Sequence, residues 1–167
     1  MPLSQEDRDR IESFRVFIED SVATDDRYGA KSREDREDGS TLATRFSAGT
    51  ACWFEVSIRP LIPQVRVSFL TENRWTNEEC EEAVEESGDS MEEFVGMGFS
   101  DAGLDWAEPP VEHYREGGKF FTFATPLAMD ELSDLDRDAT RDKTLRMLEG
   151  YLIAFGPAIT VDEEEPA

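Results

Sequence analysis

Cysteine and histidine are nearly absent from this chain of 167 residues, and their scarcity removes several kinds of site. The two cysteines, Cys52 and Cys80, are too few for the disulfide framework of a small secreted protein. Because free cysteines are commonly buried, we expect two buried thiols. The single histidine, His113, has no patterned nucleophile beside it, and it lacks the paired spacing of zinc ligands. We therefore expect a protein without catalytic residues and without a zinc site.

Long apolar runs and nucleotide-binding motifs are also missing. No segment approaches the ~20 apolar residues that a membrane-spanning helix needs. The N-terminal segment, MPLSQEDRDR, has no apolar core of a signal peptide, so we expect a cytoplasmic protein. The chain contains no P-loop, no G-x-G-x-x-G fingerprint and no G-x-S-x-G nucleophile elbow. We therefore expect no cofactor.

An aspartate run, DLDRDATRD, is the best metal candidate in the chain. Its carboxylates match positions 1, 3, 5 and 9 of a calcium-binding loop and belong to Asp134, Asp136, Asp138 and Asp142. The match then fails, because Ala139 stands where the sharp turn needs glycine and Leu145 where a bidentate glutamate is required. We interpret the run as an acidic helix start, in which the carboxylates suit the helix dipole, and we expect no bound metal.

Positive charge is scarce throughout the sequence. The chain has 39 Asp and Glu against 17 Lys and Arg, which gives a formal net charge of −22. Such a chain is unsuited to a nucleic-acid backbone or an anionic membrane, because both are bound by clustered Lys and Arg. Two explanations of the acidity remain open. One is a high-salt cytoplasm, where charge repulsion is screened, and the other is an acidic protein that binds a partner.

The apolar pattern predicts an α+β domain in the order helix, strands, helix, strands, helix. Helical spacing recurs from Ser4 to Val22, in a segment that starts with a capping box at Thr76, and in a long C-terminal helix that Gly156 and Pro157 end. Strand-like alternation lies between them, and Gly117 with Gly118 marks a hairpin turn. We expect an antiparallel sheet of about five strands with one face on the core and the other in water. The core face carries Phe54, Val56, Ile58, Val67 and Phe69 and packs on the C-terminal helix.

Two polar segments flank this core. Residues 24–40 have mixed charge and a single aromatic residue, so we interpret them as a long solvated loop. Residues 161–167, VDEEEPA, form an acidic tail. The remaining chain, residues 1–160 with the loop included, is expected to be one domain.

The most ordered-looking stretch is WFEVSIRPLIPQVRVSFL, which runs from residue 53 to residue 70. Two alternating runs meet there at a turn, and Pro60 and Pro63 confine it to RPLIPQ because neither can donate a ladder hydrogen bond. Leu61 and Ile62 stand at its tip, and exposed apolar groups framed by charge often mark partner contacts. Alternatively, the charged loop or a terminal helix covers these two side chains.

Further candidates follow from strand parity. Trp53 points to the same side of its strand as Arg59, and Arg66 lies on the returning strand, so all three are placed on the face expected in water. The residues that we expect to bind a partner are Leu61, Ile62, Trp53, Arg59 and Arg66.

The element order and the acidity together resemble the type III secretion chaperone-like and YbjN-like proteins. The segments that carry the resemblance lie between Thr41 and Phe155 and read WFEVSIRPLIPQVRVSFLT, TNEECEEAVEE, KFFTFATPLA and TLRMLEGYLIAF. The resemblance implies a small α+β domain without catalysis that binds a protein segment on its sheet or helix surface, often as a dimer. A protein partner or a second copy of the chain is therefore the expected ligand.

A second class of function remains open. It is a small-molecule-binding or catalytic α+β domain with its pocket between the sheet and the helices. A deep pocket with convergent polar groups would indicate this class. A shallow apolar groove or a symmetric apolar patch would instead indicate an interaction protein.

Overall fold

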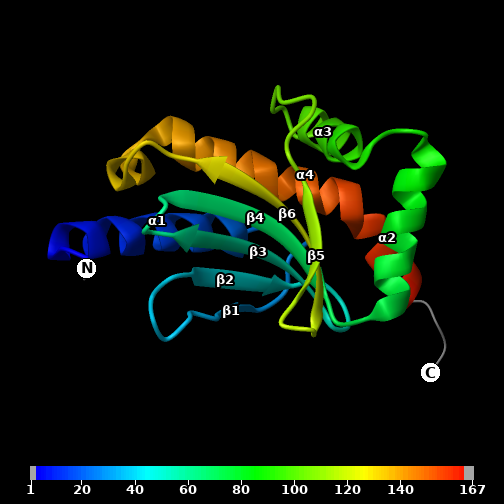
Figure 1. Ribbon diagram of the computed structural model, residues 1–167, viewed down its shortest axis with the longest axis horizontal. Helices are drawn as coiled ribbons and strands as arrows, with labels where there is room; N and C mark the ends of the chain where they lie inside the picture. The colour runs from blue at the N-terminus through cyan, green and yellow to red at the C-terminus, as the bar shows by residue number, and fades with distance from the viewer. Residues whose placement is uncertain (1–2, 164–167) are drawn as a thin grey trace.

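The fold is α+β, as the sequence predicted. The computed structural model describes residues 3–163, with side chains to residue 159. Its elements, in chain order, are α1 (Gln5–Ala23), β1 (Lys31–Arg33), β2 (Leu42–Ser47), β3 (Cys52–Arg59), β4 (Gln64–Thr71), α2 (Arg74–Ser87), α3 (Met91–Asp101), β5 (Glu112–Glu116), β6 (Phe120–Ala128), η1 (Leu132–Asp136) and α4 (Asp138–Glu163). In this part of the chain one antiparallel sheet of six strands has the order β1-β2-β3-β4-β6-β5 (Figure 1). That is one strand more than expected.

The additional strand, β1, corrects the prediction that residues 24–40 are a solvated loop. Residues 31–33 pair antiparallel with residues 44–46 of β2, although their own side chains are all exposed. Ion pairs hold this segment to α1. Arg33 donates to Glu19, with Nε 2.8 Å from Oε2, and Arg15 of α1 donates to Asp35, with Nη2 2.8 Å from Oδ1. The prediction was wrong only for residues 31–33, where ion pairs and not apolar burial hold the strand, and no residue of the segment 24–40 is buried.

Local signals set two of the helix ends, although not always where expected. Ser90 and Glu93 form the capping box of α3. The capping box predicted at Thr76 was wrong. Asn73 is the N-cap of α2, and its side chain accepts from the backbone amides of Trp75 and Thr76. Thr76 is therefore the third residue of the helix, in its first turn, and its side chain is buried.

The C-terminal helix does not end at Gly156–Pro157, so that prediction was wrong. α4 continues through Pro157 to Glu163. Proline removes one amide donor, which leaves the carbonyl of Ile153 without its usual helical partner, yet the helix persists. Residues 161–163 of the predicted acidic tail are therefore helical, and residues 164–167 lie outside the described residues.

The apolar core lies between one face of the sheet and the helices α1 and α4, which run behind it (Figure 1). Phe155 of α4 meets the sheet through two aromatic contacts, with ring centroids 5.6 Å from Phe69 and 4.7 Å from Phe123. The five predicted core residues are all buried, and α4 packs on both β3 and β4. This confirms the core that the alternation predicted.

The opposite face of the sheet is not in water, contrary to the prediction. Its central positions are almost wholly buried and include Glu55, Ser57, Arg66 and Ser68. The sheet is strongly twisted, and β5 turns steeply away from the direction of β3 and β4 (Figure 1). The long polar side chains of this face pair with one another, as in the 2.8 Å contact between Arg45 Nε and Glu55 Oε2. The sheet thus has an apolar side and an ion-paired side.

Candidate docking surface at the hairpin tip

The turn between β3 and β4 projects two apolar side chains from the body of the molecule. Leu61 is 69% exposed and Ile62 is 59% exposed. The backbone amide of Ile62 donates to the carbonyl oxygen of Arg59 at 3.3 Å, which closes the turn, and Pro60 beneath it is buried. Within the described residues, neither the charged segment nor a terminal helix covers the tip.

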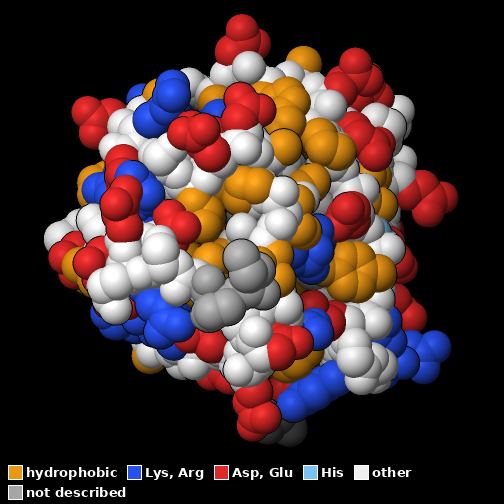
Figure 2. All heavy atoms as spheres, turned by 60° about the vertical axis from the view of Figure 1, so that its left-hand side comes forward, with side chains coloured by type: hydrophobic (Ala, Val, Ile, Leu, Met, Phe, Trp, Pro, Cys, Tyr) orange, Lys and Arg blue, Asp and Glu red, His pale blue; other side chains and the backbone are white. Residues whose placement is uncertain are grey.

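Two hollows flank this turn, and Pro60 lines both of them. Each has a volume of about 430 Å³. One lies toward η1 and is lined by Pro63 and Leu132 together with Asp7, Arg10, Glu131 and Ser133. The other lies toward the start of α1 and is lined by Leu3, Leu42 and Leu61 together with Arg8, Asp38 and Gly39. Figure 2 brings this end of the molecule forward and shows hydrophobic side chains set among acidic and basic ones. We call this region the tip surface, defined by Leu3, Leu42, Pro60, Leu61, Ile62, Pro63 and Leu132.

The other three predicted residues are placed differently from one another. Trp53 lies six residues from Arg59 along β3, about 20 Å away for an extended strand, and packs edge-on against Phe120 with centroids 5.7 Å apart. Arg66 is buried, and it donates to the Glu112 carboxylate and to the Tyr114 hydroxyl. Arg59 alone sits beside the tip, half-buried at the end of β3. The structure therefore brings together Leu61, Ile62 and Arg59, but neither Trp53 nor Arg66.

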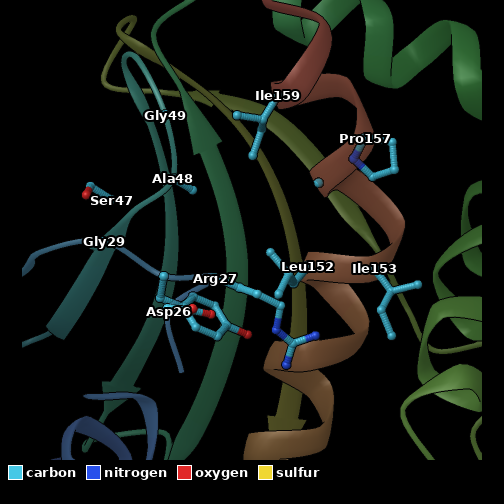
Figure 3. A pocket seen from close by; sticks show the side chains of 12 residues that line it. Asp26, Arg27, Gly29, Ser47, Ala48, Gly49, Leu152, Ile153, Pro157 and Ile159 are labelled. Atoms are coloured by element: carbon cyan, nitrogen blue, oxygen red, sulfur yellow. The ribbon is translucent and has the colours of Figure 1, made fainter. Parts of the chain in front are cut away.

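A larger hollow of about 730 Å³ lies between the turn after β2, the segment after α1, and α4 (Figure 3). Leu152 and Ile159 point from α4 toward the strands in this view. Its basic group is already engaged, because Arg27 Nη2 lies 2.7 Å from Asp25 Oδ2. Burial raises the pKa of the Tyr28 hydroxyl, which therefore stays neutral. The groove is mainly apolar and lacks the convergent polar groups that a catalytic pocket requires.

The two cysteines and the single histidine lie in packed surroundings. Cys52 and Cys80 are both buried, as predicted, and burial raises the pKa of the Cys80 thiol. His113 stacks on Phe123 with centroids 3.9 Å apart, and its Nε2 lies 2.8 Å from Glu81 Oε2. Within residues 3–163, no group of three or more His, Cys, Asp or Glu side chains is placed to hold a metal ion.

Sequence reasoning missed the residues that frame the tip. Leu3, Leu42 and Leu132 come from three separate segments, and each stands at or near the start of an element, where no periodicity singles it out. Only the fold shows that these starts meet beside the β3–β4 turn.

Comparisons with protein-family models, with curated proteins and with solved structures gave no match to this chain. Among the described residues, no helix is both long enough and apolar enough to cross a bilayer.

Proposed function

We propose that this chain is a non-enzymatic interaction module, chaperone-like or regulatory, that docks a protein segment on the tip surface. The exposed pair Leu61 and Ile62 carries the proposal. Exposed apolar groups that adjoin hollows and are framed by charge are typical of interaction sites. Pro60 and Pro63 limit the conformations of the turn, so little conformational entropy is lost when a partner binds it.

Charge indicates which kind of partner fits. Two copies of a chain with net charge −22 repel one another at low ionic strength, whereas a positively charged protein is steered toward the acidic surface. The partner that we propose is therefore a different protein with a net positive charge. Its docking segment presents apolar side chains to Leu61 and Ile62. Its basic side chains face the carboxylates of Asp7, Asp38 and Glu131, which line the two hollows of about 430 Å³.

The test compares two pairs of exposed apolar residues. The tip variant is Leu61→Ser with Ile62→Ser, and the control is Trp75→Ser with Met97→Ser, whose side chains on α2 and α3 are 67% and 61% exposed. The probe is a fluorescein-labelled amphipathic peptide of leucine and lysine, and its binding is measured by fluorescence anisotropy. We expect the control to bind like wild type. The tip variant should lose roughly tenfold in affinity, because even partial burial of two aliphatic side chains contributes ~1.4 kcal/mol.

Each remaining outcome contradicts part of the proposal. Equal losses in both variants would show that the peptide binds without using the tip. A tip variant that unfolds would show that Leu61 and Ile62 stabilise the domain itself. Sedimentation of wild type and the tip variant at 0.1 M and 1 M KCl tests whether the partner is instead a second copy of the chain. A wild-type dimer that is lost in the tip variant would show that the tip surface mediates self-association.

The groove beside α4 favours a second candidate function, the binding of a small apolar molecule. Its volume of about 730 Å³ falls within the range of about 300–1,000 Å³ that ligand pockets occupy. The dye anilinonaphthalene sulfonate is a suitable probe. Fluorescence enhancement that Leu152→Glu abolishes and the tip variant preserves would support this function.

A further inference from the structure

One arginine of this acidic chain makes no ion pair or hydrogen bond with the residues that the structure describes. All 17 Lys and Arg side chains lie in the described part of the chain, and 12 of them come within 4.0 Å of a carboxylate. Four more contact a carbonyl oxygen, a hydroxyl group or an aromatic ring, namely Arg8, Arg115, Arg141 and Lys143. That leaves Arg59, whose side chain makes no ion pair, hydrogen bond or ring contact with any described residue.

A polar atom of the residue opposite Arg59 also lacks a hydrogen-bond partner in the described part of the chain. Arg59 pairs with Gln64 at the last rung of the β3–β4 ladder, so both side chains project from the ion-paired side of the sheet. Arg59 Nε and Gln64 Oε1 are each buried without a hydrogen-bond partner among the described residues. Buried polar atoms are nearly always bonded in native proteins, so the unmatched donor of Arg59 needs an explanation. Gln64 is uncharged and leaves the positive charge of Arg59 unbalanced at this rung.

We propose that Arg59 receives a carboxylate of the docked segment, beside the apolar side chains that contact Leu61 and Ile62. This inference rests on the proposed function of the tip surface. The guanidinium group offers a planar fork of donors that matches a carboxylate. Arg59 directly precedes Pro60, so the cation and the apolar tip belong to one turn. The next arginine on this face, Arg66, is already bound to Glu112 and Tyr114 and does not compete.

The charge of the whole chain explains what such a contact achieves. A net charge of −22 opposes the approach of a carboxylate to most of the surface. A cation without a partner is therefore a position where one negative group is accepted, and like-charge repulsion discourages other placements. Arg59 thus fixes the register of the segment, while Leu61 and Ile62 supply apolar contact.

The experiment observes the arginine directly. The probes are the peptide acetyl-Leu-Leu with a free carboxylate and the same peptide with a C-terminal amide. Each is titrated into the full ¹⁵N-labelled chain, and the Nε–Hε signal of Arg59, assigned by its loss in Arg59→Gln, is followed by NMR. We expect the carboxylate peptide to bind roughly fivefold more tightly than the amide, as for a partly buried ion pair. This preference should vanish in Arg59→Gln, with binding of the amide unchanged.

The control is Arg115→Gln, because within the described residues Arg115 on β5 makes a ring contact with Phe121, at 4.8 Å, and no ion pair. It should keep the preference for the carboxylate, and the backbone spectrum of each variant verifies the fold. A preference that persists in Arg59→Gln would overturn the inference. The function of the tip would still stand if the double change at Leu61 and Ile62 weakened binding of both peptides. If neither peptide bound wild type, the inference about Arg59 would be wrong, whereas the function of the tip would be judged by binding of the leucine–lysine peptide.

Discussion

The contact between α1 and β1 depends on the buried carboxylate of Glu19, and removing its partner Arg33 should destabilise the folded protein. Glu19 is only 4% exposed. It accepts from Arg33 Nε at 2.8 Å, from Arg33 Nη2 at 3.0 Å and from the hydroxyl group of Thr44 at 2.9 Å. Burial by itself raises the pKa of Glu19, but the hydrogen bonds from Arg33 and Thr44 outweigh it, and the pKa lies below its usual value. Glu19 is therefore ionised in the folded protein at neutral pH.

The change Arg33→Ala removes two hydrogen bonds to this carboxylate. A hydrogen bond to a charged group contributes about 1.5–3 kcal/mol. Because the Arg33 side chain is itself 35% exposed, solvent screens the pair and water can replace part of the contact. Lys31, with Nζ 3.7 Å from Glu19 Oε1, also remains. We therefore expect the free energy of unfolding at pH 7 to fall by about 2–3 kcal/mol, near the lower end of the sum for two such bonds.

The loss should depend on pH in a direction that the pKa values fix. Arg33 also bonds to Glu12 and lowers its pKa. Both glutamates are thus easier to ionise in the folded state than in the unfolded chain, where the pKa is about 4.3. Their interaction with Arg33 is fully present above that value and disappears as the pH falls through the lowered folded pKa values. The gap between wild type and Arg33→Ala should therefore close under acid conditions.

Urea unfolding followed by circular dichroism, at pH steps from 7 to 3, measures this gap. The set includes wild type, Arg33→Ala, Glu19→Gln and the double variant, so that a double-mutant cycle isolates the coupling. We expect the double variant to lose less stability than the two single variants together. A gap that stayed constant across the whole pH range would refute the reasoning, because it would show that Arg33 acts through packing alone.

Two further predictions concern the core and the charge. Val56→Asp should lower the free energy of unfolding by at least ~3 kcal/mol, because it buries an unpaired carboxylate at a position only 5% exposed. The control Val16→Asp, at a position 40% exposed, should lower it by under ~1 kcal/mol. Equal thermal midpoints of the two variants would show that the assignment of the core is wrong. Raising KCl from 0.05 M to 1 M should raise the thermal midpoint, because salt screens the repulsion of a net charge of −22. A midpoint that fell with salt would instead show that the ion pairs outweigh this repulsion.

Much of the fold could be predicted because one face of the sheet obeys simple periodicity. Phe54, Val56 and Ile58 alternate along β3 and are all buried, and Ser90 with Glu93 marks the start of α3. These signals are local, since each needs only neighbouring residues. They also require no knowledge of which strands pair.

The failures share a different cause, which is that distant groups decide the outcome. β1 is exposed on every residue and is held by an arginine that reaches Glu19, fourteen positions earlier in the chain. The burial of Arg66 depends on Glu112, which lies 46 positions later. A period of two or of 3.6 residues carries no information about such partners. The sequence therefore predicted the apolar side of the sheet correctly but misplaced the ion-paired side in water.

The candidate site was predictable to the extent that backbone chemistry determines it. The two prolines confined the turn between β3 and β4, and Leu61 and Ile62 stand exposed at its tip. The sequence could not distinguish Arg59 from Arg66, because both are arginines on the same face of one hairpin. The distinction comes from pairing across the sheet, which engages Arg66 and leaves Arg59 unmatched.

This difference between the two arginines connects the composition to the site. In a chain with 39 acidic and 17 basic residues, carboxylates outnumber the cations available to pair with them. A cation at a random surface position would then readily meet a carboxylate, as most of the seventeen do. Arg59 is an exception: it makes no ion pair within the described residues, and the residue opposite it across the β3–β4 ladder is the uncharged Gln64. An arginine introduced on α2, at Glu82 for example, would lie among glutamates and pair with them, so it would not reproduce the site.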